Sequence, residues 1–194
     1  LEIEKAKRNG NYDCEDVLKR LQTDFKNKCY LCEDKISVTI DHFIPHQGKN
    51  KYLKFDWNNL FFCCSHCNST KWKSTHKILN CTIKEHGVDT KIKYSIYTSF
   101  PKEYPNIIAL ENTEIVNNTV DLLMNIYNGT TERKKMEADY LRDNLMDEIR
   151  WFELLLSEYN KDTYISKEKE NIKTEIGKQK NIIKRKPEKA IAGP

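Results

Sequence analysis

Long apolar runs and internal repeats are both missing from this sequence of 194 residues. No stretch approaches the about 20 apolar residues of a membrane-spanning helix, so we expect no membrane partner. Residues 1–11 are too polar for a secretory signal, which favours a cytoplasmic location. From the length we expect one domain, or a small domain with an appendage, and no large multidomain machine. Aromatic residues make up 10% of the chain and argue against disorder throughout.

Cysteine, in contrast, is abundant. The chain has seven cysteines, and an odd number without a secretory signal fits a reducing compartment better than a disulfide framework. We therefore expect the cysteines to bind metal rather than to form bridges.

The net charge of +4 is unevenly distributed along the chain. Residues 26–80 contain nine Lys and Arg against four Asp and Glu, a net charge of +5. Residues 103–159 contain five against twelve, a net charge of −7, and residues 160–194 contain ten against five, again +5. Because a positive field attracts a polyanion such as DNA, we expect a nucleic-acid partner on the first segment and not on the acidic middle.

Hydrophobic spacing predicts short strands in the first half of the chain and long helices in the second. Pro101 and Pro105 are expected to interrupt regular structure, and the basic tail beyond Asp162 is either a solvated helix or a partly disordered arm. The predicted strands cover residues 36–40, 60–64 and 91–100. The predicted helices cover residues 13–27, a short stretch after Cys67, residues 113–128 and residues 132–159, the last two packing on each other and on the cysteine-rich part.

Two Cys-x-x-Cys pairs, Cys29 with Cys32 and Cys64 with Cys67, are separated by 31 residues. Two residues between thiolates let one tight turn aim both sulfurs at one ion, and two such turns complete the tetrahedral shell of a structural zinc site. The alternative is a set of buried or redox-active thiols, but neither pair starts a helix inside a βαβ pattern. We predict one structural Zn²⁺ bound by these four cysteines.

The remaining cysteines and one histidine have less specific surroundings. Cys63 is separated from Cys67 by three residues, which is a poorer match to the first pair, so we expect a core thiol. Cys14 and Cys81 lack partners at ligand spacing and are expected to pack as small apolar side chains. His66, inside the second pair, can in principle replace a cysteine as ligand, but we expect it to face solvent or a phosphate.

Between the cysteine pairs, residues 39–46 read Thr-Ile-Asp-His-Phe-Ile-Pro-His. Adjacent Asp and His side chains in a strand point to different sides unless the strand ends or bends, and Pro45 favours a bend. Histidine has a suitable pKa for a general base near neutral pH, and carboxylate and amide oxygens suit a divalent cation.

The segment from Cys29 to Lys71 resembles the zinc-bearing form of the HNH endonuclease family. The resemblance rests on five ordered elements: Cys-x-x-Cys, hydrophobic-Asp-His-hydrophobic-hydrophobic-Pro, Trp-Asn-Asn-Leu, Cys-x-x-Cys-Asn, and a lysine three residues later. It implies a ββα-metal module with zinc at its base and a second, catalytic cation, and it says little about the rest of the chain.

The resemblance also implies roles for single residues. His42 matches the general base, and Asp41 and Asn68 match the ligands of a catalytic Mg²⁺ or Mn²⁺ ion. Asn59 matches the asparagine that holds the histidine loop and orients its imidazole. Taken one at a time, the same residues have simpler explanations: Asp41 can cap a turn, and both asparagines can be ordinary turn residues.

Three further residues are candidates for nucleic-acid contact. Lys71 follows Asn68 by three residues, so on a helix both side chains project to one side and the lysine can neutralise a phosphate. Lys73 and His46 are the other two. The alternative to catalysis is a zinc-stabilised module that binds nucleic acid without cleaving it.

We therefore predict an α+β chain in two parts: an N-terminal helix with an HNH module over residues 1–100, and a mainly helical extension with a basic tail over residues 101–194. An HNH core with a helical extension is similar to nuclease subunits of bacterial antiphage defence systems, including Septu-like and retron-linked systems with an ATPase partner. This resemblance implies a metal-dependent endonuclease that hydrolyses DNA and binds a protein such as an ATPase subunit through its helical half. Homing and restriction nucleases of the same family remain open, and no sequence-reading helix-turn-helix is visible.

Overall fold

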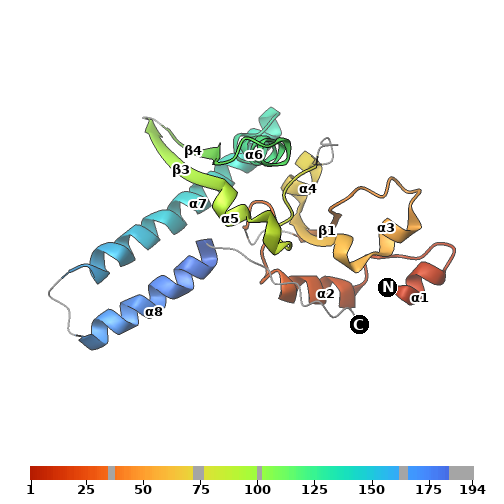
Figure 1. Ribbon diagram of the computed structural model, residues 1–194, viewed down its shortest axis with the longest axis horizontal. Helices are drawn as coiled ribbons and strands as arrows, with labels where there is room; N and C mark the ends of the chain where they lie inside the picture. Colours follow the sequence, from red (N-terminus) through yellow and green to blue (C-terminus); the bar gives the residue numbers. More distant parts are fainter. Residues whose placement is uncertain (35–37, 72–76, 100–101, 162–165, 184–194) are drawn as a thin grey trace.

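A computed structural model of the chain describes residues 1–34, 38–71, 77–99, 102–161 and 166–183. The structure is mixed α+β, and its described residues contain two separate two-stranded sheets (Figure 1). In chain order the elements are α1 (Glu2–Ala6), α2 (Glu15–Asp24), β1 (Val38–His42), α3 (Lys51–Phe55), the 3-10 turn η1 (Trp57–Asn59), β2 (Leu60–Cys64), α4 (Ser65–Lys71), the 3-10 turn η2 (Lys84–His86), α5 (Val88–Lys91), β3 (Ile92–Ser99), β4 (Lys102–Ala109), α6 (Glu114–Asn128), α7 (Glu132–Tyr159) and α8 (Ser166–Ile183).

The first sheet pairs β1 with β2 in antiparallel register, with Val38 opposite Cys64 and His42 opposite Leu60. All residues of β2 are buried. A strand that is covered on both faces reads as a continuous apolar run rather than an alternation, which explains the sequence Leu-Phe-Phe-Cys-Cys. Helix α4 follows β2 directly and packs on both strands.

Three of the predicted elements of the first half are present. Helix α2 confirms the helix predicted over residues 13–27, and β2 confirms the strand predicted over residues 60–64. The strand predicted over residues 36–40 is confirmed from residue 38 onward, and β1 continues through His42.

Helix α4 begins earlier than expected. The capping side chains after Cys67 and the spacing of Trp72, His76 and Leu79 predict a helix after these caps, but α4 spans Ser65–Lys71. Trp72 and His76 lie outside the described residues, and Leu79 lies in no helix. The hydroxyls of Ser69 and Thr70 donate to the carbonyl oxygen of His66 at 3.0 and 2.8 Å. These side chains therefore bond within the helix instead of capping it, which serine and threonine also do.

The second sheet was predicted only in half. Strand β3 confirms the strand predicted over residues 91–100, but the expectation that Pro105 interrupts regular structure is wrong, since it lies within β4 opposite Ile96. Pro101, for which the same was expected, lies outside the described residues. In the described residues β3 and β4 pair with no further strand, so each strand has an open edge. Proline is tolerated at such an edge because its missing N–H removes no ladder hydrogen bond.

The helical half follows the sequence pattern closely. Helices α6 and α7 confirm the two predicted helices, and Gly129, with a φ of 69°, follows α6 as its C-cap. The basic tail forms α8 up to Ile183, and α8 lies along α7 at the end of the molecule away from α2 and α3 (Figure 1). Within the described ranges, no helix is long and apolar enough to cross a membrane.

Two apolar clusters form the core. One joins α2 to the first sheet and contains Val17, Leu21, Phe25, Ile40, Leu60, Phe61 and Phe62. The other joins the two cysteine pairs to the second sheet and to α6 and α7 through Ile92, Ile107, Val116, Leu122, Leu123, Ile126, Tyr127 and Leu141. The helical half thus packs on the cysteine-rich part, as predicted. This cluster contains residues from both sides of residue 100. The division of the chain into two parts at residue 100 stays a prediction.

His66 connects α4 to the helical half. Its Nδ1 lies 2.7 Å from Oε2 of Glu137, and its Nε2 lies 2.9 Å from the carbonyl oxygen of Ile126. The expectation that His66 faces solvent or a phosphate is therefore wrong, because the side chain is buried between helices. The hydrogen bond from His66 lowers the pKa of the Glu137 carboxyl.

His66→Ala is expected to lower the free energy of unfolding by about 2 kcal/mol, since it leaves the Ile126 carbonyl without its buried donor. Glu137→Gln, at a side chain that is 38% exposed, should cost less than about 1 kcal/mol. Urea unfolding followed by circular dichroism measures both. Equal stability of wild type and His66→Ala would contradict this role for His66.

Candidate functional site

The four cysteines of the two pairs come together between the first sheet and the helical half. Their Sγ atoms all lie within 4.8 Å of one another, and all four residues are buried. Zinc–sulfur bonds of about 2.3 Å in a tetrahedron place the sulfurs about 3.8 Å apart. The Sγ atoms of Cys32 and Cys64 are 3.8 Å apart. This donor set fits a zinc ion, as the sequence predicts.

The thiols of the cluster shift one another's pKa: the hydrogen bond with Cys29 raises the pKa of Cys32, and burial raises the pKa of Cys67, both well above the ordinary value. Burial raises the pKa of the Cys29 thiol, but hydrogen bonds from the other cysteines outweigh burial and lower this pKa well below its ordinary value. The amide of Cys67 donates to Sγ of Cys64 at 3.4 Å, as expected in a tight metal-binding turn. A thiolate in such a buried place needs a positive partner, which a zinc ion provides.

Cys63 lies closer to this cluster than its predicted role as a core thiol implies. It is fully buried, and its Sγ is 3.9 Å from Sγ of Cys29. Burial raises the pKa of Cys63 well above its ordinary value, which favours the neutral thiol. Cys14 and Cys81 pack against the cluster of α2 and the first sheet, as predicted.

Asp41, near the end of β1, is held in a buried ion pair. Its Oδ2 accepts hydrogen bonds of 2.8 Å from both the Lys71 ammonium and the Tyr30 hydroxyl. Lys71 also donates to the carbonyl oxygen of His42 at 2.6 Å. Asp41 and Lys71 are each 7% exposed. The residue predicted to contact phosphate thus has its ammonium group engaged inside the fold, and phosphate contact stays a prediction.

His42 has different neighbours from Asp41, as alternation along a strand requires. Its Nε2 lies 2.9 Å from the carbonyl oxygen of Lys54. A carbonyl only accepts, so Nε2 carries the proton and the neutral ring has its lone pair on Nδ1. The rings of Tyr12 and His46 lie 4.5 and 4.4 Å from the His42 ring. Burial lowers the pKa of His42, so the ring is a neutral base.

Asn59 holds the loop between His42 and α3. Its Oδ1 accepts from the amide of Ile44 at 2.7 Å, and its Nδ2 donates to the carbonyl oxygens of Ile44 and Leu53 at 2.9 and 3.0 Å. One buried amide therefore joins the start of this loop to α3, the helix whose Lys54 carbonyl contacts His42. A catalytic contribution of Asn59 stays a prediction.

Asn68 and Lys71 both contact β1, so α4 projects them to one side, as predicted. Nδ2 of Asn68 donates to Oγ1 of Thr39 at 3.2 Å, one helical turn before the contact of Lys71 with Asp41. Thr39 and Asp41 are two residues apart and share a face of the strand, which places Asn68 and Asp41 on the same side. Asn68 also lines an open pocket of about 360 Å³ with Thr39, Ser65 and Ser69.

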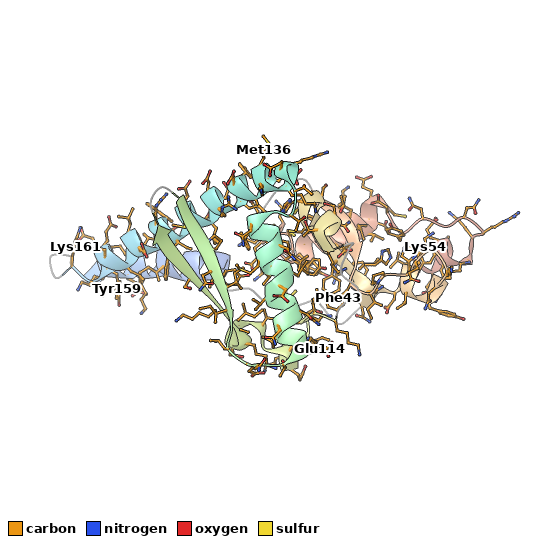
Figure 2. All side chains as sticks on the ribbon, turned by 90° about the horizontal axis from the view of Figure 1, so that it is seen from above. Phe43, Lys54, Glu114, Met136, Tyr159 and Lys161 are labelled. Carbon is orange, nitrogen blue, oxygen red and sulfur yellow. The ribbon has the colours of Figure 1, made fainter. Side chains whose placement is uncertain are left out.

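The site includes residues that no sequence motif marks. Tyr30 is one of the two residues between Cys29 and Cys32, and Tyr12 lies before α2. Lys54 contributes its backbone carbonyl, which contacts His42. Nothing in their spacing predicts these contacts. His46 lies in the loop after β1, whereas Lys73 lies outside the described residues. In Figure 2, Phe43 and Lys54 lie on one side of α6, and Tyr159, at the end of α7, lies on the other side.

Cys64→Ala is expected to remove the bound zinc and to lower the free energy of unfolding by about 3 kcal/mol or more, because structural zinc contributes directly to folding. Cys81→Ala is the matched control and should keep the metal. Elemental analysis of the purified variants, combined with urea unfolding, checks both. Zinc at the wild-type level in Cys64→Ala would refute the four-cysteine site.

Asn59→Ala is expected to lower the free energy of unfolding by about 2 to 4 kcal/mol, because it leaves buried backbone groups of the loop without partners. Asn58→Ala, at the exposed neighbouring position, should change it by less than about 0.5 kcal/mol. Chemical denaturation compares the two. Similar effects of both substitutions would show that Asn59 does not hold the loop.

Comparison with known proteins matches part of the chain. Over an alignment of 85 residues it is 33% identical to the Septu protein PtuB of Bacillus mycoides (strain KBAB4). The alignment covers 36% of this chain and 29% of that protein, so the chain spans less than a third of the length of the curated relative that it matches. No family model matches the chain, and no solved structure does so. Part of the chain is thus similar to a Septu protein.

Proposed function

We propose that the chain is a metal-dependent endonuclease of the HNH type that hydrolyses DNA phosphodiester bonds and acts in antiphage defence. The observation that carries this proposal is His42, a neutral histidine whose Nε2 is fixed by the Lys54 carbonyl and whose Nδ1 is the basic nitrogen. His42 lies beside Asp41 on the strand pair β1–β2, which α4 follows directly, and the second cysteine pair has Cys64 at the end of β2 and Cys67 in α4. The similarity to a Septu protein supports the defence role.

The reaction assigned to this site is attack of water on a phosphodiester. Nδ1 of His42 takes a proton from the water, whose oxygen forms a bond to phosphorus while the bond to the 3′ oxygen breaks. The Lys54 carbonyl holds the ring and stabilises the imidazolium that forms, because Nε2–H donates more strongly from a charged ring. Asn59 supports the position of this carbonyl through its hydrogen bond to the neighbouring Leu53 carbonyl of α3.

Asp41 and Asn68 are the residues that would hold the catalytic ion. Their carboxylate and amide oxygens are the ligands that Mg²⁺ and Mn²⁺ prefer, and both residues lie on the same side of β1. The two hydrogen bonds that Asp41 accepts in the described structure both reach Oδ2, which leaves Oδ1 for a cation. When bound, a divalent ion supplies positive charge for the phosphate and the departing 3′ oxygen.

DNA is the proposed substrate because residues 26–80, which contain His42, Asp41 and Asn68, have a net charge of +5. Lys73 and Lys71 are the lysines proposed to contact phosphate. The Lys71 ammonium is bound to Asp41, so this lysine is proposed to contact a DNA phosphate within the site, from its position beside Asp41.

The helical half is the proposed docking part for a protein partner such as an ATPase subunit. Residues 103–159 have a net charge of −7, which disfavours DNA there. Helix α7 also exposes four large apolar side chains. Such an arrangement is more typical of an interaction surface than of a helix face that only contacts solvent. These are Met136, Tyr140, Trp151 and Leu154.

His42→Ala is expected to lower cleavage of supercoiled plasmid in Mg²⁺ or Mn²⁺ by at least about 100-fold, because no other group replaces the general base. DNA binding and zinc content should be unchanged. His86→Ala, a histidine on η2, is the matched control and should cleave normally. Gel electrophoresis of the plasmid over time measures the rates.

A non-catalytic binding module is the alternative that this experiment separates from a nuclease. If wild type and His42→Ala bind DNA equally and neither cleaves it, the chain binds nucleic acid without hydrolysis. If His42→Ala cleaves as fast as wild type, the role of His42 is wrong.

A further inference from the structure

His46 lies in the loop after β1 with its ring packed against the ring of the proposed general base. The ring centroids of His42 and His46 are 4.4 Å apart and their planes are inclined by 64°. Tyr12 contacts both rings, at 4.5 and 6.2 Å. His46 is only partly buried, so it connects the covered His42 with the surface where a substrate must approach.

The backbone of the loop fixes the His46 ring. Gln47 and Gly48 adopt positive φ angles of 53° and 69°, and this turn brings the amide of Gly48 to 3.0 Å from Nδ1 of His46. The amides of Lys49 and Asn50 both donate to the carbonyl oxygen of His46 at 3.1 Å. Gln47 has no glycine-like freedom at this φ, so the conformation is held by these bonds rather than by backbone preference.

These contacts determine which nitrogen carries the proton. A backbone amide can only donate, so Nδ1 of His46 accepts and has no proton, and the proton of the neutral ring is on Nε2. In His42, the N–H of Nε2 donates to the carbonyl of Lys54, which leaves the lone pair of Nδ1 as a base. In His46, Nδ1 accepts a hydrogen bond from the amide of Gly48, which leaves the N–H of Nε2 as a donor. Adjacent rings therefore offer a base and a hydrogen-bond donor.

The neutral form of His46 has electrostatic support. Burial and the positive charge of Lys54 lower the pKa of His46. The other groups around the ring are the neutral His42 and the Tyr12 hydroxyl, whose pKa burial raises. Neither of these places a negative charge beside the ring that would favour the imidazolium.

We propose that His46 is a second catalytic residue of the nuclease proposed above, and that its neutral Nε2–H donates a hydrogen bond to a non-bridging oxygen of the scissile phosphate. The water proton goes to Nδ1 of His42, the phosphorus–3′ oxygen bond breaks, and the 3′ oxygen takes its proton from solvent. His46 transfers no proton, because loss of the Nε2 proton from a ring without a proton on Nδ1 would leave an imidazolate. Its contribution is electrostatic, like that of a donor in an oxyanion hole.

Three substitutions of His46 distinguish this role from the two others that a histidine beside a catalytic base can have. His46→Ala removes the donor and the ring, His46→Phe keeps a ring without a donor, and His46→Gln keeps a neutral N–H donor at a similar distance from the backbone. We expect kcat for plasmid cleavage to fall about 10- to 100-fold in the Ala and Phe variants and less than about 5-fold in the Gln variant.

Each other pattern overturns the proposal. If the Gln variant is as slow as the Ala variant, His46 gives up a proton as a general acid. If the Phe variant is as fast as wild type, His46 only packs against His42. Zinc content and urea unfolding of all three variants show whether a loss of activity reflects a loss of structure.

A spectroscopic measurement tests the proton positions without using activity. The chain has five histidines, so a long-range ¹H–¹⁵N spectrum of histidine-labelled protein is simple to assign with the single variants. At neutral pH we expect His46 and His42 both to show the Nε2–H tautomer, and addition of uncleaved DNA in EDTA to shift Nε2 of His46. An Nδ1–H tautomer at His46 overturns the proposal, even if His42→Ala confirms the nuclease. If His42→Ala still cleaves, the proposed nuclease mechanism fails, whichever tautomer His46 shows.

Discussion

Four cysteine sulfurs within 4.8 Å of one another are the constraint on which the rest of the structure depends. Two of the sulfurs come from the loop before β1, one from the end of β2 and one from α4. A cation that binds all of them fixes three segments at once in a part of the chain with only five-residue strands. Such short strands cannot form a stable pair alone, so the cluster supplies the connection that a larger core would otherwise give.

The site is built outward from this cluster. Tyr30 lies between the first two cysteines and donates to Asp41, and α4 begins beside Cys64 and carries Lys71 to the same carboxylate. The metal-binding turns and the proposed catalytic carboxylate are therefore one bonded unit. On the other face of β1, Asn59 and the Lys54 carbonyl set the position of His42 through a separate set of hydrogen bonds. The side chains of the base and of the proposed ion ligands thus have different hydrogen-bond partners, whereas Lys71 joins Asp41 to the backbone carbonyl of His42.

The sequence predicts what depends on local patterns and misses what depends on partners. Apolar spacing locates α2, β2, α6 and α7, and cysteine spacing predicts the metal cluster, because each pattern is contained in one segment. Strand β4 is missed because Pro105 is unfavourable in a wide sheet but acceptable in an isolated pair. His66 is misplaced because its acceptors lie on α6 and α7, far away in sequence. The sequence predicts His42 as the general base, but the residue types do not indicate the contact with the Lys54 carbonyl that defines its tautomer.

Helix α4 has seven residues, and successive positions contact different neighbours. His66 reaches the helical half, Cys67 the metal cluster, Asn68 Thr39, and Lys71 the buried carboxylate. One inserted residue rotates everything after it by about 100°, so a single insertion in this helix would misdirect all later contacts together. Substitutions along α4 are separable in their effects, whereas changes of length are not. We therefore expect relatives of this chain to vary in loop length before Cys64 and not between Cys64 and Lys71.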